Sequence, residues 1–378
     1  MLPVGNSSLE LGYGRWLLSL LVGTALGAGS PAVAQARRAG ASPSGAHPEP
    51  ELTRDAERAV EEGVAYLARL QRDRSGSWPC TPQRYRMSVS ALAGLALLAH
   101  GDTPTSGRYA RNVRKLIEWM LDAQRRYAEV NPPLAGLLFD LEEESRDDRP
   151  MHGHGFALLF LAEAYGNTAR PELRRRLHEA IHAAVRVTAN SISRDGGWYY
   201  HPVARPGQQY LDEGSVTVTQ IQALRAANNA GIEVDAGLID RAVRYLHASQ
   251  DRRTGGIRYR SSSGRTSAAL TAAGVTCFHG AGIYGGAALE RAYDYLRLTL
   301  DPSQQQDFFY YTHLYGAQAM FQRGGPEWAD YFPKIRRELL ARRGGRPYWK
   351  HRFGKAYATA IALLILQIPK RYLPIFQR

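Results

Sequence analysis

The sequence predicts an all-α protein in which six helical hairpins close into a ring, an α/α toroid. Two kinds of apolar segment alternate along the chain, and glycine-rich connections with an aromatic residue follow several of them. The first kind is amphipathic, and the second is apolar on nearly every side. This alternation is expected where one layer of helices faces solvent and a second layer is surrounded by other helices.

The amphipathic segments have apolar residues at i, i+3, i+4 and i+7 with charges between them, which is typical of surface helices. We expect them to form the outer layer. They span residues 59–71, 113–124, 177–188, 239–250, 289–300 and 331–342.

The second kind of segment is rich in Ala, Gly, Ser and Thr, as a helix packed among several neighbours requires. These segments span residues 88–99, 154–165, 215–227, 266–275, 310–321 and 355–368. Six segments of each kind favour a closed ring with these helices inside. An open superhelix is the structural alternative.

The N-terminal part of the chain differs in composition from the repeats. An apolar stretch at 16–29 follows Arg15 and leads into Ala-Val-Ala at 32–34, which predicts a signal peptide over residues 1–34 and an exported protein of the periplasm, cell envelope or exterior. The stretch is short for a bilayer span, although a retained anchor stays open. Residues 35–50 have the composition of a disordered linker, and residues 51–378 form the predicted repeat domain.

Positive charge is concentrated near the C-terminus. The formal net charge is +13, and residues 334–378 hold twelve Lys or Arg against the single acid Glu338. Such a patch fits an anionic membrane surface or wall polymer, with a solvated basic face as the alternative. No nucleic-acid motif is present, so we expect no nucleic-acid partner. The candidate residues are Arg336, Arg337, Arg342, Arg343, Arg346, Lys350, Arg352 and Lys355.

The connections repeat a local pattern. A glutamine ends an outer segment, glycine follows a few residues later, and an aromatic or apolar residue comes next, as at Gln71 with Gly76 and Trp78, and at Gln250 with Gly255. Glycine allows the turn after a helix, and the aromatic side chain can pack beneath the next hairpin.

This pattern resembles the repeats of squalene and oxidosqualene cyclases and of protein prenyltransferase β subunits. Further segments are similar to secreted bacterial proteins with prenyltransferase/squalene-oxidase repeats, among them HGFALLFLAEAYG at 154–166 and DEGSVTVTQIQAL at 212–224. The likeness covers nearly all of residues 55–378. It implies an α/α toroid, whereas fold alone does not fix activity.

Two motifs on which the resembling families depend are missing. The sequence has no Asp-x-Asp-Asp acid motif, so squalene cyclisation by the usual route is not expected. Cys277 and His279 lack the Asp that completes a prenyltransferase zinc site, so Cys277 is interpreted as a buried thiol and no metal or cofactor is expected. A thioester motif of the complement type is also absent.

Polar residues remain at the starts of the inner segments, which face the centre of a ring. Asp212 is the candidate catalytic acid or anion stabiliser, with His154 or His313 as its partner. The competing interpretations are a helix cap for Asp212 and Glu213 and satisfied core side chains for the two histidines. The candidate ligand-binding residues are Tyr310, Tyr311 and Tyr357.

Three functions follow from these observations, and the sequence leaves open whether the protein is an enzyme. The first is a cell-envelope binding protein for an apolar or isoprenoid ligand. The second is a terpenoid or prenyl-type enzyme that uses Asp212 with a histidine. The third is a carbohydrate-active ring enzyme, which needs two carboxylates about 5 to 10 Å apart and for which Asp212 or Glu213 with Glu163 is the available pair.

Overall fold

The computed structural model describes residues 52–377 except 82–84, 143–147, 262 and 305–307. The predicted signal peptide (1–34) and linker (35–50) lie outside the described residues. All the described helices belong to one unit, residues 46–378. The outer helices are α1 (Arg54–Leu70), α3 (Ala110–Val130), α5 (Pro171–Asn190), α7 (Ala236–Ser249), α9 (Ala287–Thr299) and α11 (Gly325–Arg343). The inner helices are α2 (Arg86–His100), α4 (Pro150–Gly166), α6 (Gly214–Asn229), α8 (Ala268–Gly280), α10 (Phe309–Arg323) and α12 (Lys355–Gln367).

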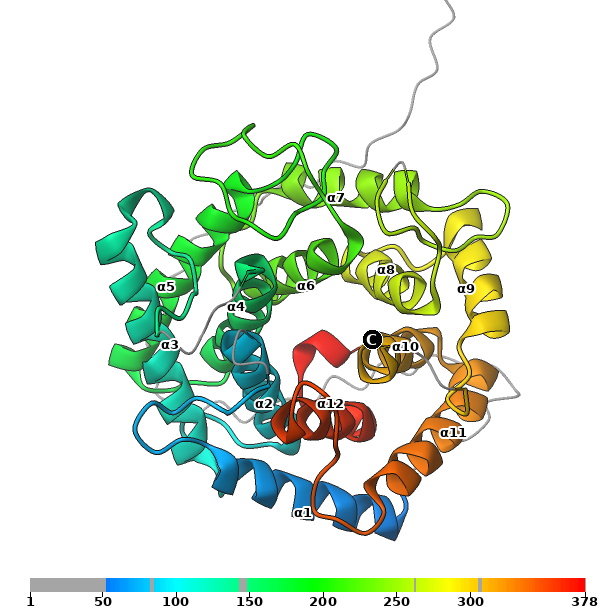
Figure 1. The fold of residues 1–378 in the computed structure, drawn as a ribbon, viewed down its shortest axis with the longest axis horizontal. Coiled ribbons are helices and arrows are strands. Elements are labelled where there is room, and N and C mark those ends of the chain that lie inside the picture. The colour runs from blue at the N-terminus through cyan, green and yellow to red at the C-terminus, as the bar shows by residue number, and fades with distance from the viewer. Residues whose placement is uncertain (1–51, 82–84, 143–147, 262, 305–307, 378) are drawn as a thin grey trace, which may run out of the picture. The chain divides into compact units, whose positions relative to one another are not determined.

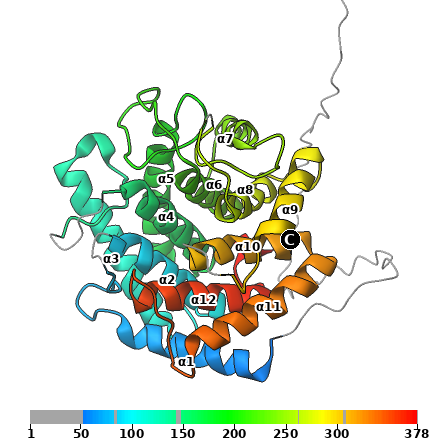
Figure 2. The same cartoon turned by 45° about the vertical axis from the view of Figure 1, so that its right-hand side comes forward.

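The inner helices form a closed ring inside the outer ones (Figure 1). Each inner helix packs against the next, and α12 packs against α2 to complete the circle. At this junction the Gln367 side-chain amide donates to the Ala96 carbonyl over 3.1 Å. The predicted α/α toroid is therefore confirmed, and the open superhelix is wrong. Figure 2 shows the same helices after a turn of 45°.

Each predicted segment corresponds to a helix, but several boundaries differ by five or six residues. The sequence pattern places the start of the sixth outer helix at residue 331, whereas α11 begins at Gly325. Gly324 and Gly325 have positive φ and turn the chain sharply after α10, and Pro326 then occupies the first turn, where its missing N–H costs nothing. The helix continues through Pro333.

Glutamine side chains link successive outer helices. The Gln71 amide donates to the Gly76 carbonyl (2.7 Å) in its own connection and to the Asn112 carbonyl (2.9 Å) in α3. Gln124 makes the same pair of bonds to Gly136 and α5, and Gln250 makes it to Gly255 and α9. We call this two-bond arrangement the glutamine clamp.

Glycine is required beside each clamp because the turn touches the next outer helix. Gly76, Gly136 and Gly255 all have positive φ. A Cβ at Gly255 would lie only 2.1 Å from the Arg291 carbonyl oxygen of α9, and one at Gly76 would lie 2.4 Å from the Lys115 carbonyl oxygen of α3. Both the backbone conformation and the close approach exclude a side chain.

Buried tryptophans fix the inner helices to the outer ones. The indole N–H groups of Trp78, Trp198 and Trp349 donate to carbonyls near the ends of α1, α5 and α11 over 2.7–2.8 Å. Their main-chain N–H groups donate to a hydroxyl in the following inner helix, from Ser90, Thr217 and Thr359 respectively. Each tryptophan thus supplies a donor to a carbonyl near the end of an outer helix, and its own main-chain N–H in the connection is hydrogen-bonded as well.

The C-terminal tail lies against the end of the inner ring at which the inner helices terminate. It contains two short 3₁₀ helices, η3 (Ile368–Lys370) and η4 (Pro374–Phe376), and η4 packs against α6 while η3 packs against α2 and α10. Figure 1 shows this red segment within the circle of inner helices. The Ile375 main-chain N–H donates to the Glu163 carboxyl over 3.1 Å.

Replacing Gly255 with alanine tests the clamp. The Gly255→Ala variant should lose about 3 kcal/mol or more of unfolding free energy, because it adds a clash with α9 to an unfavourable positive φ. Gly282→Ala is the matched control, since Gly282 has φ +81 and nothing within 4 Å of the added Cβ, and should lose only about 1 kcal/mol. Equal losses in denaturant melts of the two variants would contradict the clamp.

Candidate functional site

The six inner helices begin at the same end of the ring. Their starts are joined by main-chain hydrogen bonds from Met151 to Tyr200, from Gly214 to Tyr259 and from Thr81 to Phe353. We call this end the ring mouth: the first residues of the inner helices and the connections that lead into them. Aligned helix N-termini also give the mouth a positive potential.

A buried carboxylate lies on one side of the mouth. Glu213 is fully buried and caps α6, accepting from the main-chain N–H groups of Ser215 (3.0 Å) and Val216 (2.7 Å). The Ser215 hydroxyl also donates to it, and His152 of α4 lies 3.2 Å from that hydroxyl and 3.6 Å from the Glu213 carboxyl. Burial raises the pKa of Glu213 and lowers the pKa of His152 to about 4, so the imidazole is neutral at pH 7.

Two tyrosines and an arginine cover this carboxylate. The Tyr200 and Tyr259 hydroxyls are hydrogen-bonded to each other, and the Arg149 guanidinium stacks 4.6 Å from the Tyr200 ring centre. Burial, the Tyr259 hydroxyl and the Glu213 charge all raise the pKa of Tyr200, so the phenol stays protonated. Tyr200 is half-buried and Tyr259 is 36% exposed, which leaves both rings accessible at the surface of the mouth.

The other side of the mouth is aromatic. Tyr357 packs against His351 (ring centres 5.1 Å apart), Phe353 (5.4 Å) and Tyr310 (6.3 Å). Tyr311 packs 4.9 Å from Tyr315, and its pKa is raised by burial and by nearby groups that include Glu213. The predicted ligand-binding tyrosines therefore stand at the mouth, and Tyr311 brings the aromatic and polar sides together.

The three predicted catalytic residues are not brought together. Asp212 points toward Ser193 (3.5 Å) and Tyr245 of the outer helix α7, and burial raises its pKa. His154 bonds to the connection before α4 and to α5, and His313 bonds to the Tyr331 hydroxyl of α11 over 2.8 Å. No contact among the described residues joins any two of the three. Of the two residues predicted to cap α6, Glu213 does so and Asp212 does not.

The histidines occupy a repeated structural position. His154 and His313 are the fifth residues of their helices, as Ser90 and Thr359 are of α2 and α12. The His154 Nδ1 accepts from the Leu138 main-chain N–H over 3.1 Å, so Nε2 carries the proton and donates to Thr188 over 3.0 Å. Burial lowers the pKa to about 4 for His154 and about 3 for His313. His154 thus accepts a hydrogen bond from the main chain of the connection before its helix, as Ser90 and Thr359 do in their own hairpins.

The predicted basic patch is divided by local contacts. Arg343 is buried and paired with Glu62, Arg342 pairs with Glu338, and Arg346 donates to the Arg342 carbonyl. Arg336 packs over Phe332. The members that are exposed to solvent are Arg337, Lys350, Arg352 and Lys355.

Cys277 and His279 do not form a joint site. The Cys277 thiol is buried against the Val218 carbonyl, and burial raises its pKa. His279 bonds to the Tyr293 hydroxyl over 2.7 Å. Within the described residues, no group of three or more His, Cys, Asp or Glu side chains is placed to hold a metal ion.

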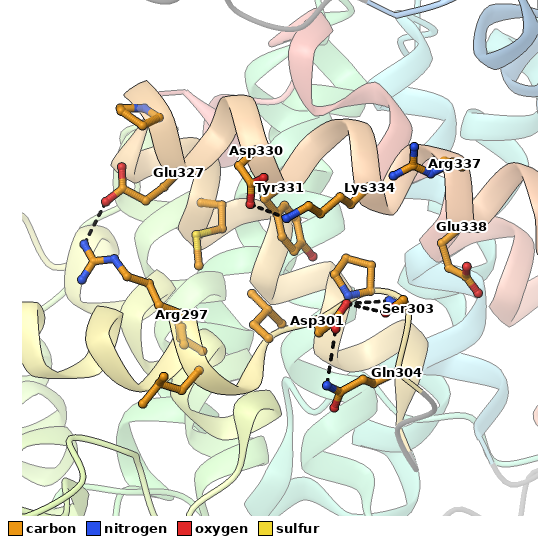
Figure 3. A pocket seen from close by; sticks show the side chains of 16 residues that line it. Arg297, Asp301, Ser303, Gln304, Glu327, Asp330, Tyr331, Lys334, Arg337 and Glu338 are labelled. Atoms are coloured by element: carbon orange, nitrogen blue, oxygen red, sulfur yellow. Dashed lines mark hydrogen bonds and ion pairs between the residues drawn. The ribbon is translucent and has the colours of Figure 1, made fainter.

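A separate groove of about 870 Å³ lies on the outside of the ring, between the end of α9 and α11 (Figure 3). Its charged rim residues bind one another, with Arg297 paired to Glu327 (2.8 Å) and Lys334 to Asp330 (2.6 Å). These four charges are already neutralised within the groove. Its lining includes residues 301–304 in the connection that leads into α10, but none of the side chains described above as the polar and aromatic sides of the mouth.

The polar side of the mouth is only partly visible in the sequence. Glu213, His152 and Ser215 stand out there only as polar groups near inner-helix starts, and Arg149 and Tyr200 do not stand out at all. The Gly-Trp-Tyr-Tyr run at 197–200 is a usable signal, because Trp198 is buried and the residues after it must emerge at the mouth.

No family model and no curated protein matches the sequence. Solved structures do match. The α-1,6-mannanase GH76A of Salegentibacter sp. HEL1_6 aligns with a TM-score of 0.59 and 9% identity over 84% of this chain and 99% of its own. Cellobiose 2-epimerase from Bacillus thermoamylovorans B4167 gives 0.59 and 10% over 84% and 99%. The type II terpene cyclase MstE from Scytonema gives 0.52 and 15% over 85% and 100%.

At these identities the comparisons show the fold alone. A terpene cyclase shares the ring, as the resemblance implied, and two enzymes named for carbohydrates share it as well. The sequence resemblance to cyclases is therefore supported at the level of the α/α toroid.

Glu163 cannot pair with Glu213, as the carbohydrate hypothesis required. Glu163 lies eleven residues beyond His152 in α4, about 16 Å along the helix axis, and its carboxyl binds the C-terminal tail. Burial raises its pKa to about 7 against the opposing effects of the Ile375 N–H and Arg225. The two carboxyls stand toward opposite ends of the ring.

The raised pKa predicts how pH acts through Glu163. The Glu163 carboxyl holds its proton more tightly in the folded protein than in the unfolded chain. Its contribution to the free energy of unfolding is therefore complete below the ordinary glutamate pKa of 4.5 and is lost as pH rises to about 7. Glu163→Gln keeps an acceptor for Ile375 without the charge. Relative to the wild type, it should gain stability between pH 5 and 8, on the order of 3 kcal/mol. A flat difference across that range would contradict the assignment, and the exposed Glu233→Gln variant is measured beside it as the control.

Proposed function

We propose that the protein binds an apolar or isoprenoid ligand at the ring mouth. The observation that carries the proposal is the set of partly exposed tyrosines at the mouth: Tyr311 and Tyr357 lie on inner helices, and Tyr200 and Tyr259 lie in the connections. Aromatic rings left partly open beside a few polar groups are typical of ligand sites.

The two sides of the mouth suit the two ends of an isoprenoid. The hydrocarbon packs against Tyr311, Tyr357 and the nearby Phe353. A terminal hydroxyl or anionic group meets the Tyr200 and Tyr259 hydroxyls and the Arg149 guanidinium. Glu213 acts from below by holding Ser215 and the start of α6 in place, since it is fully buried.

A binding role fits this geometry better than catalysis through Asp212. That carboxyl turns toward α7, and neither proposed histidine partner contacts it. The ring position and the buried state of His154 and His313 support a structural role for both.

A sugar ligand is the second candidate. Sugars also stack on tyrosine rings while hydroxyls, imidazoles and guanidinium groups bind their oxygens, and Tyr200, Tyr259 and His152 offer such groups here. The fold likeness to a mannanase and an epimerase favours testing it.

Calorimetric titration separates the two ligands. We expect farnesol to bind and mannotriose or cellobiose not to bind. Tyr357→Ala should weaken farnesol binding by about tenfold, because a ring face is lost from the contact. Tyr109→Ala is the control, because that half-buried tyrosine occupies the N-cap position of α3 at the other end of the ring. Binding of a sugar and not of farnesol would favour a carbohydrate ligand instead. Equal losses of farnesol affinity in Tyr357→Ala and Tyr109→Ala would refute the site at the mouth.

A further inference from the structure

The exposed apolar side chains are concentrated at one end of the ring. The described residues expose nine large hydrophobic side chains, and seven of them lie at the mouth end. Two of the seven, Val130 and Leu298, are in the last turns of outer helices. The other five stand in the connections into inner helices: Leu141, Tyr210, Leu211, Tyr259 and Phe308. Only Tyr284 and Tyr372 are exposed at the opposite end of the described chain.

An arginine guanidinium lies over each of the two most exposed aromatic rings of the mouth. Tyr210 is 65% exposed, and the Arg194 guanidinium lies 4.5 Å from its ring centre. Phe308 is 51% exposed, and Arg352 lies 5.7 Å from its ring. At a membrane surface, an aromatic ring settles at headgroup level while a guanidinium binds lipid phosphate.

Two of the connections that lead to the mouth are basic, whereas the connections that carry Tyr210 and Phe308 themselves hold more acids than bases among their described residues. Residues 344–354 contain Arg346, Lys350 and Arg352 and no acid. The described residues of 250–267 contain five arginines against Asp251 alone. Each basic group near an anionic bilayer adds about 1 kcal/mol of attraction.

We infer that the ring-mouth face docks on an anionic lipid bilayer, with Tyr210, Leu211 and Phe308 at headgroup level. A polyanionic polymer would use the basic groups but leave these apolar side chains in water, whereas a bilayer takes up both. None of the described helices is long and apolar enough to cross a membrane. This inference rests on the proposed function in one respect. Docking would let a poorly soluble ligand pass directly from the lipid to the mouth.

Site-directed fluorescence tests this contact. Cys80 and Cys277 are both buried, so a surface cysteine can be labelled selectively with an environment-sensitive dye in the full chain. The labelled positions are Tyr210→Cys and Phe308→Cys at the mouth. The matched controls are Tyr284→Cys and Tyr372→Cys, whose native side chains are 61% and 56% exposed at the other end.

Vesicles of phosphatidylcholine with phosphatidylglycerol should shift the dye emission to the blue at positions 210 and 308 and leave it unchanged at 284 and 372. Vesicles of phosphatidylcholine alone should give a much smaller shift. Equal shifts at all four positions, or vesicle binding with no shift at the mouth, would assign binding to another part of the chain and overturn the inference. Shifts caused by a polyanionic wall polymer and not by vesicles would overturn it as well.

A second pair of variants separates docking from ligand binding. Tyr210→Ser combined with Phe308→Ser should lower the partition coefficient onto anionic vesicles, measured from the fraction that sediments with them, by at least about tenfold. Tyr284→Ser with Tyr372→Ser should leave it unchanged. Farnesol binding in solution should be equal in both, so that docking and the proposed function can fail independently. Sedimentation unaffected by the mouth pair would refute docking even if farnesol binds.

Discussion

The glutamine clamp is the interaction on which the rest of the ring depends. Each clamp joins the end of one outer helix to the next outer helix, through a turn so close that only glycine fits. In the first hairpin, the clamp sets where the connection leaves the outer layer, and the buried Trp78 then sets where the inner helix starts. Among the described residues, clamps at three joints and buried tryptophans in three connections together align the starts of the inner helices at one end of the ring.

The fold could be predicted from sequence because its signals are local and repeated. Surface and buried helices differ in pattern, and the Gln-Gly-aromatic run marks the joints. The site depended on side-chain direction, which the pattern does not contain. Asp212 and Glu213 are neighbours in extended backbone, so their side chains point to opposite sides, one to α7 and the other to α4. His154 is a catalytic candidate by residue type, yet it fills a position that serine or threonine holds elsewhere.

The two ends of the ring are built for different tasks. At one end the tail packs on the inner helices and binds a carboxyl whose pKa is raised to about 7. At the other end, tyrosines remain partly open above a buried and fully hydrogen-bonded glutamate. The polar groups beneath the mouth therefore hold the start of α6 in place, and the aromatic surface above them is where we propose that a ligand binds. This division is why a binding role follows more directly from the geometry than an acid-catalysed one.

Photo-cross-linking measures the central claim most directly. A farnesol analogue with a photoactivatable group would be irradiated with the protein, and the labelled peptides would be identified by mass spectrometry. The account predicts labels on the inner-helix starts that carry Tyr311 and Tyr357 and on the connection that carries Tyr200. Labels confined to the outer groove between α9 and α11, or spread evenly over the outer helices, would contradict it.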